Sequence, residues 1–136
     1  MAGSFTDGFE VEILKIVTGQ ATSIVTTTPL AAVYVGLTTD VPTDSSAGTE
    51  VSGGSYARVD SKGSWATPSA GSVSTNADVT FPAPTGNWGT VQGFNIYDAV
   101  TGGNRLAWGD LTSSKTINNG DQAPKFTSGS LTITQS

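Results

Sequence analysis

The chain has 136 residues, of which 36% are hydrophobic and only 12% are charged, and it contains no cysteine and no histidine. This length suits one domain with a single core. Because both residue types are missing, the sequence excludes Ser-His-Asp and Cys-His relays, disulfides, and zinc and haem sites. The formal net charge is −5, and the six Lys and Arg residues are scattered singly, which argues against nucleic-acid binding.

The beginning of the sequence lacks the pattern of a secretion signal, because no basic segment is followed there by a continuous apolar run. Nowhere in the sequence do about 18 apolar residues follow one another, as a membrane-spanning helix would need. We therefore expect a protein that is made in the cytoplasm and has no membrane partner.

An amphipathic helix is predicted over residues 4–18. Four apolar side chains recur at close to helical spacing and form one stripe: Phe5, Phe9, Ile13 and Ile16. Ser4 suits the amino-terminal cap, the acidic Asp7 and Glu10 suit the first turn, and Gly19 suits the end. The stripe is a candidate interface with a neighbouring molecule, and packing on the chain's own β domain is the alternative.

After residue 20 the hydrophobic period becomes two, which is typical of β-strands. Strands are predicted over residues 31–38, 56–64, 73–81, 91–98, 105–112 and 130–135. Regularly spaced short strands of this kind predict an all-β fold, a β-sandwich of Greek-key or jelly-roll type with one short amino-terminal helix. The predicted organisation is a helical segment over 1–20 and a β-sandwich domain over 21–136.

Two pairs of turn residues predict β-hairpins. Gly102-Gly103 separates two apolar and aromatic runs, and Asn119-Gly120 is the strongest two-residue hairpin signal in the chain.

The remaining route to catalysis is a pair of carboxylates that face one another across a cleft. Asp98 and Asp110 flank a predicted hairpin, but no acidic and aromatic cleft motif surrounds them. They are interpreted as a solvated strand end and a turn residue, so the protein is not expected to be an enzyme.

Residues 40–50 are acidic and polar and could suggest a calcium loop. The third position is Pro42, the sixth is Ser45 where such a loop requires Gly, and the twelfth is Val51 where it requires Glu. No metal and no cofactor are therefore expected.

The aromatic residues allow two interpretations. Trp65, Trp88 and Trp108 could form a platform that stacks on sugars, or they could belong to the hydrophobic core. The core is favoured, and Trp88 and Phe94 are predicted to be buried near the central strands.

An ordered series of motifs resembles small structural proteins of bacteriophages, whose genes are often labelled tail fibre-like. The motifs are TEVSGGSYAR at 49–58, VTFPA at 79–83, NWGTV at 87–91, FNIYD at 94–98 and TGGN at 101–104. The likeness continues to the end of the chain and covers roughly residues 30–136. It implies a β-sandwich module of the virion, either a capsid decoration (cement) protein or a part of the tail, baseplate or fibre.

Several residues of these motifs are expected to determine the fold: Glu50, Gly53, Gly54, Tyr56, Arg58, Trp88, Gly89, Phe94, Asp98, Gly102 and Gly103. Gly53 and Gly54 permit a positive φ, and the Tyr56 ring can be buried while its hydroxyl stays hydrogen-bonded. Arg58 is predicted to pair with Glu50 across the turn.

Capsid decoration is the function favoured at this point, because fibres usually need long shafts and this chain is short. A tail, baseplate or fibre component that binds host glycans is the alternative. The expected partners are other copies of the chain in a homotrimer and the major capsid protein or tail proteins. The expected location is the virion.

Overall fold

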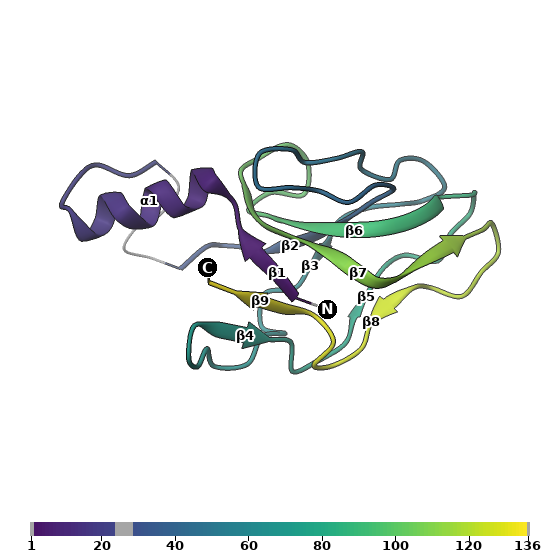
Figure 1. Cartoon of the computed structure of the whole chain (residues 1–136). Coiled ribbons are helices and arrows are strands. Elements are labelled where there is room, and N and C mark those ends of the chain that lie inside the picture. The colour runs from purple at the N-terminus through teal and green to yellow at the C-terminus, as the bar shows by residue number, and fades with distance from the viewer. Residues whose placement is uncertain (1, 24–28, 136) are drawn as a thin grey trace.

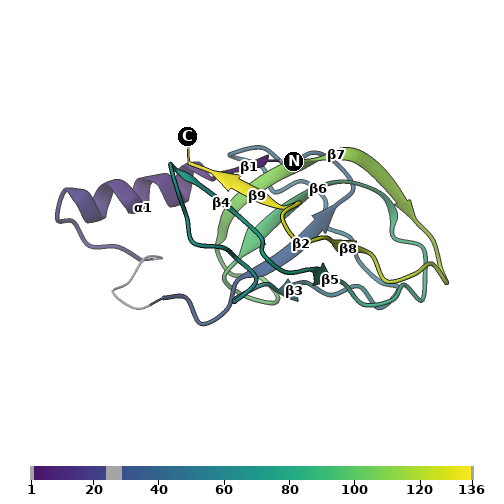
Figure 2. The same cartoon turned by 90° about the horizontal axis from the view of Figure 1, so that it is seen from below.

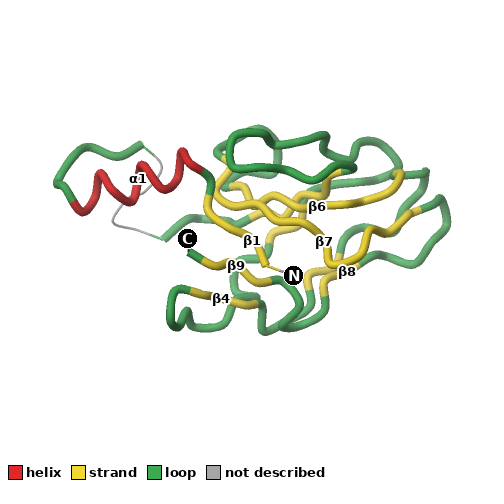
Figure 3. Tube along the Cα trace, viewed as in Figure 1, coloured by secondary structure: helices red, strands yellow, loops and turns green. Residues whose placement is uncertain are grey.

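The computed structural model describes residues 2–23 and 29–135, which form β-strands, long loops and one helix (Figure 1, Figure 3). The elements are β1 Ala2–Phe5, α1 Asp7–Val17, β2 Tyr34–Thr38, β3 Val59–Asp60, β4 Ser72–Ser74, β5 Val79–Thr80, β6 Gly89–Tyr97, β7 Arg105–Ile117, β8 Lys125–Phe126 and β9 Thr132–Thr134. A seven-stranded sheet has the order β3-β2-β6-β7-β1-β9-β4, and β5 pairs with β8 in a separate ribbon. The all-β fold with one short amino-terminal helix is thus confirmed.

Helix α1 confirms the helix that its apolar spacing predicted, with a shifted start. Thr6, and not Ser4, is the amino-terminal cap, and its side-chain oxygen accepts a hydrogen bond of 3.3 Å from the Phe9 backbone N–H. The helix ends at Val17 with Thr18 as its carboxy-terminal cap. Gly19 follows with a φ of +72°, the left-handed backbone conformation in which helices often terminate. Ser4 is not the cap because it lies inside strand β1.

Strand β1 lies within the sheet, antiparallel to β7 and parallel to β9. Gly3 is paired with Gly109, and this close approach requires glycine on both strands. A Cβ on Gly109 would lie 2.6 Å from the Phe94 ring, and a Cβ on Gly3 would collide with the Trp108 carbonyl oxygen. Residues 2–5 therefore belong to the sheet, while the division of the chain near residue 20 stays a prediction.

Strands β6 and β7 form the central hairpin of the sheet, as Gly102-Gly103 predicted. Both glycines have a positive φ, and the loop of residues 98–104 is closed by Asp98. The Asp98 carboxylate accepts hydrogen bonds of 2.7 and 2.8 Å from the backbone and side-chain nitrogens of Asn104. The turn is thus held by its own side chains.

The hairpin predicted at Asn119-Gly120 is wrong, although the chain does turn there. Gly120 has a φ of +83°, but the next strand, β8, pairs with β5 and not with the preceding β7. This pairing carries the ring of Phe126 into the core, where it contacts Phe81 and Phe94 edge-on at 6.2 and 5.9 Å. The aromatic contacts are non-local, so the turn residues alone do not reveal them.

The core lies between the curled sheet and the ribbon of β5 and β8. Phe94 is fully buried and Trp88 is 4% exposed, which confirms the predicted burial of both. Trp65 packs at the edge of this core, whereas the half-buried Trp108 donates its indole N–H to Asp44. The second layer is thus a two-stranded ribbon with loops, smaller than the second sheet of a regular sandwich.

Candidate functional site

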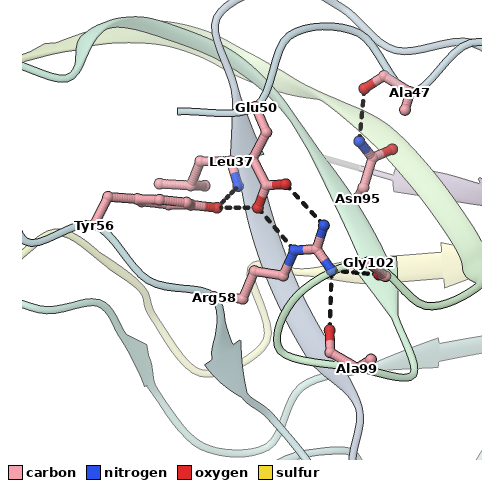
Figure 4. Close-up of polar contacts among 8 residues, drawn as sticks. All are labelled: Leu37, Ala47, Glu50, Tyr56, Arg58, Asn95, Ala99 and Gly102. Atoms are coloured by element: carbon pink, nitrogen blue, oxygen red, sulfur yellow. Dashed lines mark hydrogen bonds and ion pairs between the residues drawn. The ribbon is translucent and has the colours of Figure 1, made fainter. Parts of the chain in front are cut away.

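A cluster of polar side chains joins two loops beside the end of strand β6 (Figure 4). Glu50 Oε1 accepts hydrogen bonds from the Tyr56 hydroxyl at 2.9 Å and from Arg58 Nε at 2.8 Å. Glu50 Oε2 accepts a third bond from Arg58 Nη2 at 2.8 Å. The predicted pairing of Arg58 with Glu50 is therefore present, in the two-bond geometry that is strongest for these groups.

The guanidinium of Arg58 also binds the loop between β6 and β7. Its Nη1 donates to the carbonyl oxygens of Ala99 and Gly102, both at 2.9 Å. The guanidinium carbon lies 3.4 Å from the centre of the Tyr97 ring, a close cation–π contact. Arg58 thus ties the segment that carries Glu50 to the loop of residues 98–104.

Tyr56 connects the same cluster to strand β2 and to the core. Its hydroxyl oxygen accepts a hydrogen bond of 2.8 Å from the Leu37 backbone N–H. Its ring lies edge-on to Trp88 at 5.3 Å and stacks on Phe81 at 6.4 Å. The polar cluster therefore rests on the aromatic core.

The pKa shifts of the cluster favour a permanent ion pair. Burial raises the pKa of the Glu50 carboxyl, but hydrogen bonds from Arg58 and Tyr56 and the charge of Arg58 bring it below its ordinary value. Burial lowers the pKa of Arg58, and the hydrogen bond and charge of Glu50 outweigh this and raise it. Burial also raises the pKa of Tyr56. At neutral pH the three groups keep their usual protonation states, so they are not poised for proton transfer.

The other predicted fold-determining residues lie in two places. Gly53 and Gly54 have positive φ values, and the Gly54 carbonyl accepts the Trp88 indole N–H at 2.9 Å, next to the cluster. Gly89, also at positive φ, follows Trp88 at the start of β6. Phe94 lies apart from the polar cluster, in the core.

The predicted interface stripe is only partly exposed. Phe5 and Phe9 contact one another edge-on at 5.0 Å, and both are half-buried, as is Ile13. Ile16 is 48% exposed. The sequence pattern missed Val11 and Leu14, which are 49% and 63% exposed. The signal that could have revealed them is an apolar residue on what should be the polar face of the helix.

The carboxylates weighed for catalysis lie apart along the hairpin. Asp98 closes the loop of residues 98–104, whereas Asp110 is paired with Gly93 farther along β7. The hairpin therefore does not bring the two side chains together.

The acidic loop after β2 is closed by its own hydrogen bonds. Asp40 accepts from the Thr49 backbone N–H at 2.7 Å and from the Thr49 hydroxyl at 3.2 Å. Within residues 2–23 and 29–135 no three acidic side chains converge to hold a metal ion. We expect EDTA to leave the melting temperature unchanged in a thermal scan. A fall of several degrees would instead reveal a bound cation, since a ligand at 100 times its dissociation constant adds about 2.7 kcal/mol of stability.

In the part of the chain that the structure describes, helix α1 is too short and too polar to span a membrane.

Comparison with known proteins identifies the family. The family model described as podophage GP4 fiber I protein gp80 matches residues 4–134. The chain belongs to this family. No curated protein matches it. Membership confirms the resemblance to phage structural proteins and makes the chain a structural component of the virion, in a family of fibre proteins.

Proposed function

We propose that the protein is a fibre component of a podophage particle. The match of residues 4–134 to a fibre family carries this proposal. It favours the fibre over capsid decoration, which the shortness of the chain had suggested. The polar cluster supports a structural role, because Arg58 fixes two loops through side-chain and backbone contacts and none of its partners is poised for chemistry.

The copy number in purified virions tests the assignment. Quantitative mass spectrometry against the major capsid protein should find few copies per particle, and particles without the protein should adsorb poorly to host cells. A ratio near one per capsid subunit, with normal adsorption, would instead support capsid decoration.

Helix α1 is proposed to attach the module to another virion protein. The helix extends to one side of the strands (Figure 2). Among the described side chains of the helix, the exposed apolar ones are Val11, Leu14 and Ile16. Asp7 and Glu10 lie in its first turn.

Charge decides the kind of partner that suits this helix. The only basic residue of α1, Lys15, pairs with Glu12 at 2.7 Å, so the helix has a net negative charge. An apolar surface bordered by Lys or Arg complements it, whereas a second copy of α1 would bring acidic residues together. We therefore assign the docking partner as a different virion protein with a basic rim.

Paired substitutions test the docking. Val11→Ser and Leu14→Ser together should reduce incorporation into particles about 30-fold, because burying each half-exposed side chain contributes about 1 kcal/mol. The control is Val41→Ser, since Val41 is 50% exposed and Val11 is 49% exposed. Equal incorporation of both variants would refute the docking role. Deletion of residues 1–19 is a poorer test, because it also removes strand β1.

The homotrimer is retained as a proposal. The two edge strands of the large sheet, β3 and β4, have only two and three residues. Short edges give little backbone for pairing between copies. A trimer would therefore need side-chain contacts from other surfaces.

A further inference from the structure

A surface depression of about 360 Å³ lies beside the polar cluster. Residues 50–53, 56–58 and 100–102 line it. Its two walls are the segment that carries Glu50 and the loop of residues 98–104, which Arg58 ties together. The Arg58 side chain is itself largely buried, with 7% of it exposed. The depression is thus held in shape before any ligand arrives, which reduces the entropy lost on binding.

The ion pair of Glu50 and Arg58 can still make hydrogen bonds at two adjacent atoms, Glu50 Oε2 and Arg58 Nη2. Glu50 Oε2 accepts one bond, from Arg58 Nη2, although a carboxylate oxygen can accept two. Nη2 uses one of its two hydrogens in that bond, and the other has no partner among the described residues. The Glu50 side chain is 30% exposed, so a ligand can reach its carboxylate.

The charge balance of the Glu50–Arg58 pair excludes most ionic ligands. The carboxylate of Glu50 and the guanidinium of Arg58 neutralise one another. Four of the five guanidinium hydrogens are already bonded within the protein. An anion would therefore find one donor and no net positive charge. A cation would compete with the three hydrogen bonds that the Glu50 carboxylate already accepts.

The lining around the pair offers neutral groups. The hydroxyls of Ser52 and Thr101 make no hydrogen bond within the described part of the chain, and both residues are exposed. Val100, 48% exposed, adds an apolar surface on the same side. Neutral donors and acceptors around a small apolar patch suit a ligand that carries several hydroxyls on a saturated ring.

We propose that this depression is a binding site for a neutral saccharide. One sugar hydroxyl donates to Glu50 Oε2 and accepts from Arg58 Nη2, and neighbouring hydroxyls bond to Ser52 and Thr101. The ring face lies on Val100. The site is shallow and makes few hydrogen bonds, so dissociation constants of about 1–10 mM are expected for single sugars.

Titration of the purified full-length protein by ¹H–¹⁵N NMR tests the site. The probes are D-glucose, D-galactose, L-rhamnose and N-acetyl-D-glucosamine, with glycerol as the control polyol. At least one sugar should produce saturable shifts confined to residues 50–58 and 99–103. No saturable shift with any of the four, or equal shifts with glycerol, would overturn the proposal. Saturation by sulfate in these residues would overturn the assignment of a neutral ligand.

Matched threonine variants link the binding to the depression. Thr101→Val removes a hydroxyl that makes no bond in the folded chain and should weaken sugar binding about two- to tenfold. Thr112→Val changes a threonine on β7 that is also exposed but lies outside the depression, and it should leave binding unchanged. Equal affinities of the two variants would contradict the site. The measurement uses isolated protein, so its outcome is independent of where the protein sits in the virion.

Discussion

Replacing Trp88 with alanine is expected to lower the free energy of unfolding by about 3–5 kcal/mol, a large share of the stability of a domain of this size. Trp88 is 4% exposed, and its indole N–H donates to the Gly54 carbonyl at 2.9 Å. Its ring also supports Tyr56 edge-on at 5.3 Å. The truncation therefore removes core packing, a partly buried hydrogen bond and the aromatic support of the polar cluster together. Urea denaturation measures the loss.

Trp108 provides the matched control for Trp88. It is half-buried, lies outside the core and donates its indole N–H to Asp44. Trp108→Ala should therefore cost clearly less stability than Trp88→Ala. If the two variants unfold at the same urea concentration, Trp88 does not have the central role that its burial indicates.

Replacing Arg58 with alanine is expected to lower the free energy of unfolding by about 2–3 kcal/mol. Removing one partner of a fully buried ion pair costs about 3–5 kcal/mol, and the effect is smaller here because the Glu50 side chain is 30% exposed. The variant also leaves the carbonyls of Ala99 and Gly102 without their donor. Urea denaturation of Arg58→Ala at neutral pH gives the value.

The ion pair between Lys125 and Asp78 is the control for charge removal. Its N···O distance of 2.8 Å equals that of the Arg58–Glu50 pair, but the side chains are 48% and 42% exposed. Lys125→Ala should therefore unfold indistinguishably from the parent, since solvent screens exposed pairs. Equal losses in the two variants would show that burial does not set the strength of the Arg58 contacts.

The effect of Arg58→Ala should depend on pH with a definite sign. The pKa of Glu50 is lowered in the folded protein from its ordinary value of 4.5, so the pair stabilises the fold at higher pH. This contribution is lost as the pH falls below 4.5 and passes through the folded-state pKa. The difference in stability between parent and variant should therefore be largest at neutral pH and shrink in acid. A constant difference down to pH 3 would contradict the role of the Glu50 charge.

The sequence was informative where local chemistry decides the structure. Helix α1 follows from apolar spacing, and the β6–β7 hairpin follows from Gly102-Gly103, because each depends on residues close together in the chain. Burial of Trp88 and Phe94 was also predicted, since large aromatic residues among strands favour the core.

Non-local pairing explains what the sequence did not reveal. Strand β1 has small residues and little alternation, and it becomes a strand because Gly3 fits against Gly109. The predicted strand over 73–81 divides into β4 and β5, which belong to different sheets. In the polar cluster, charge and proximity predicted that Arg58 would pair with Glu50. The carbonyl partners Ala99 and Gly102 depend on how the β6–β7 loop meets the cluster in three dimensions.

The place of β1 between β7 and β9 has a consequence for how the protein reaches its native state. Ala2 lies opposite Thr132, so one of the earliest strands of the chain can complete its pairing only with one of the latest. Contacts between residues so far apart in the sequence form only after a large loop has closed, so the entropy of closure is lost before the contacts stabilise the fold. Such topologies are associated with folding times of milliseconds to seconds. A nascent chain would meanwhile expose the pairing edge of β1, so slow folding and misassembly between chains are the hazards of producing this protein at high concentration.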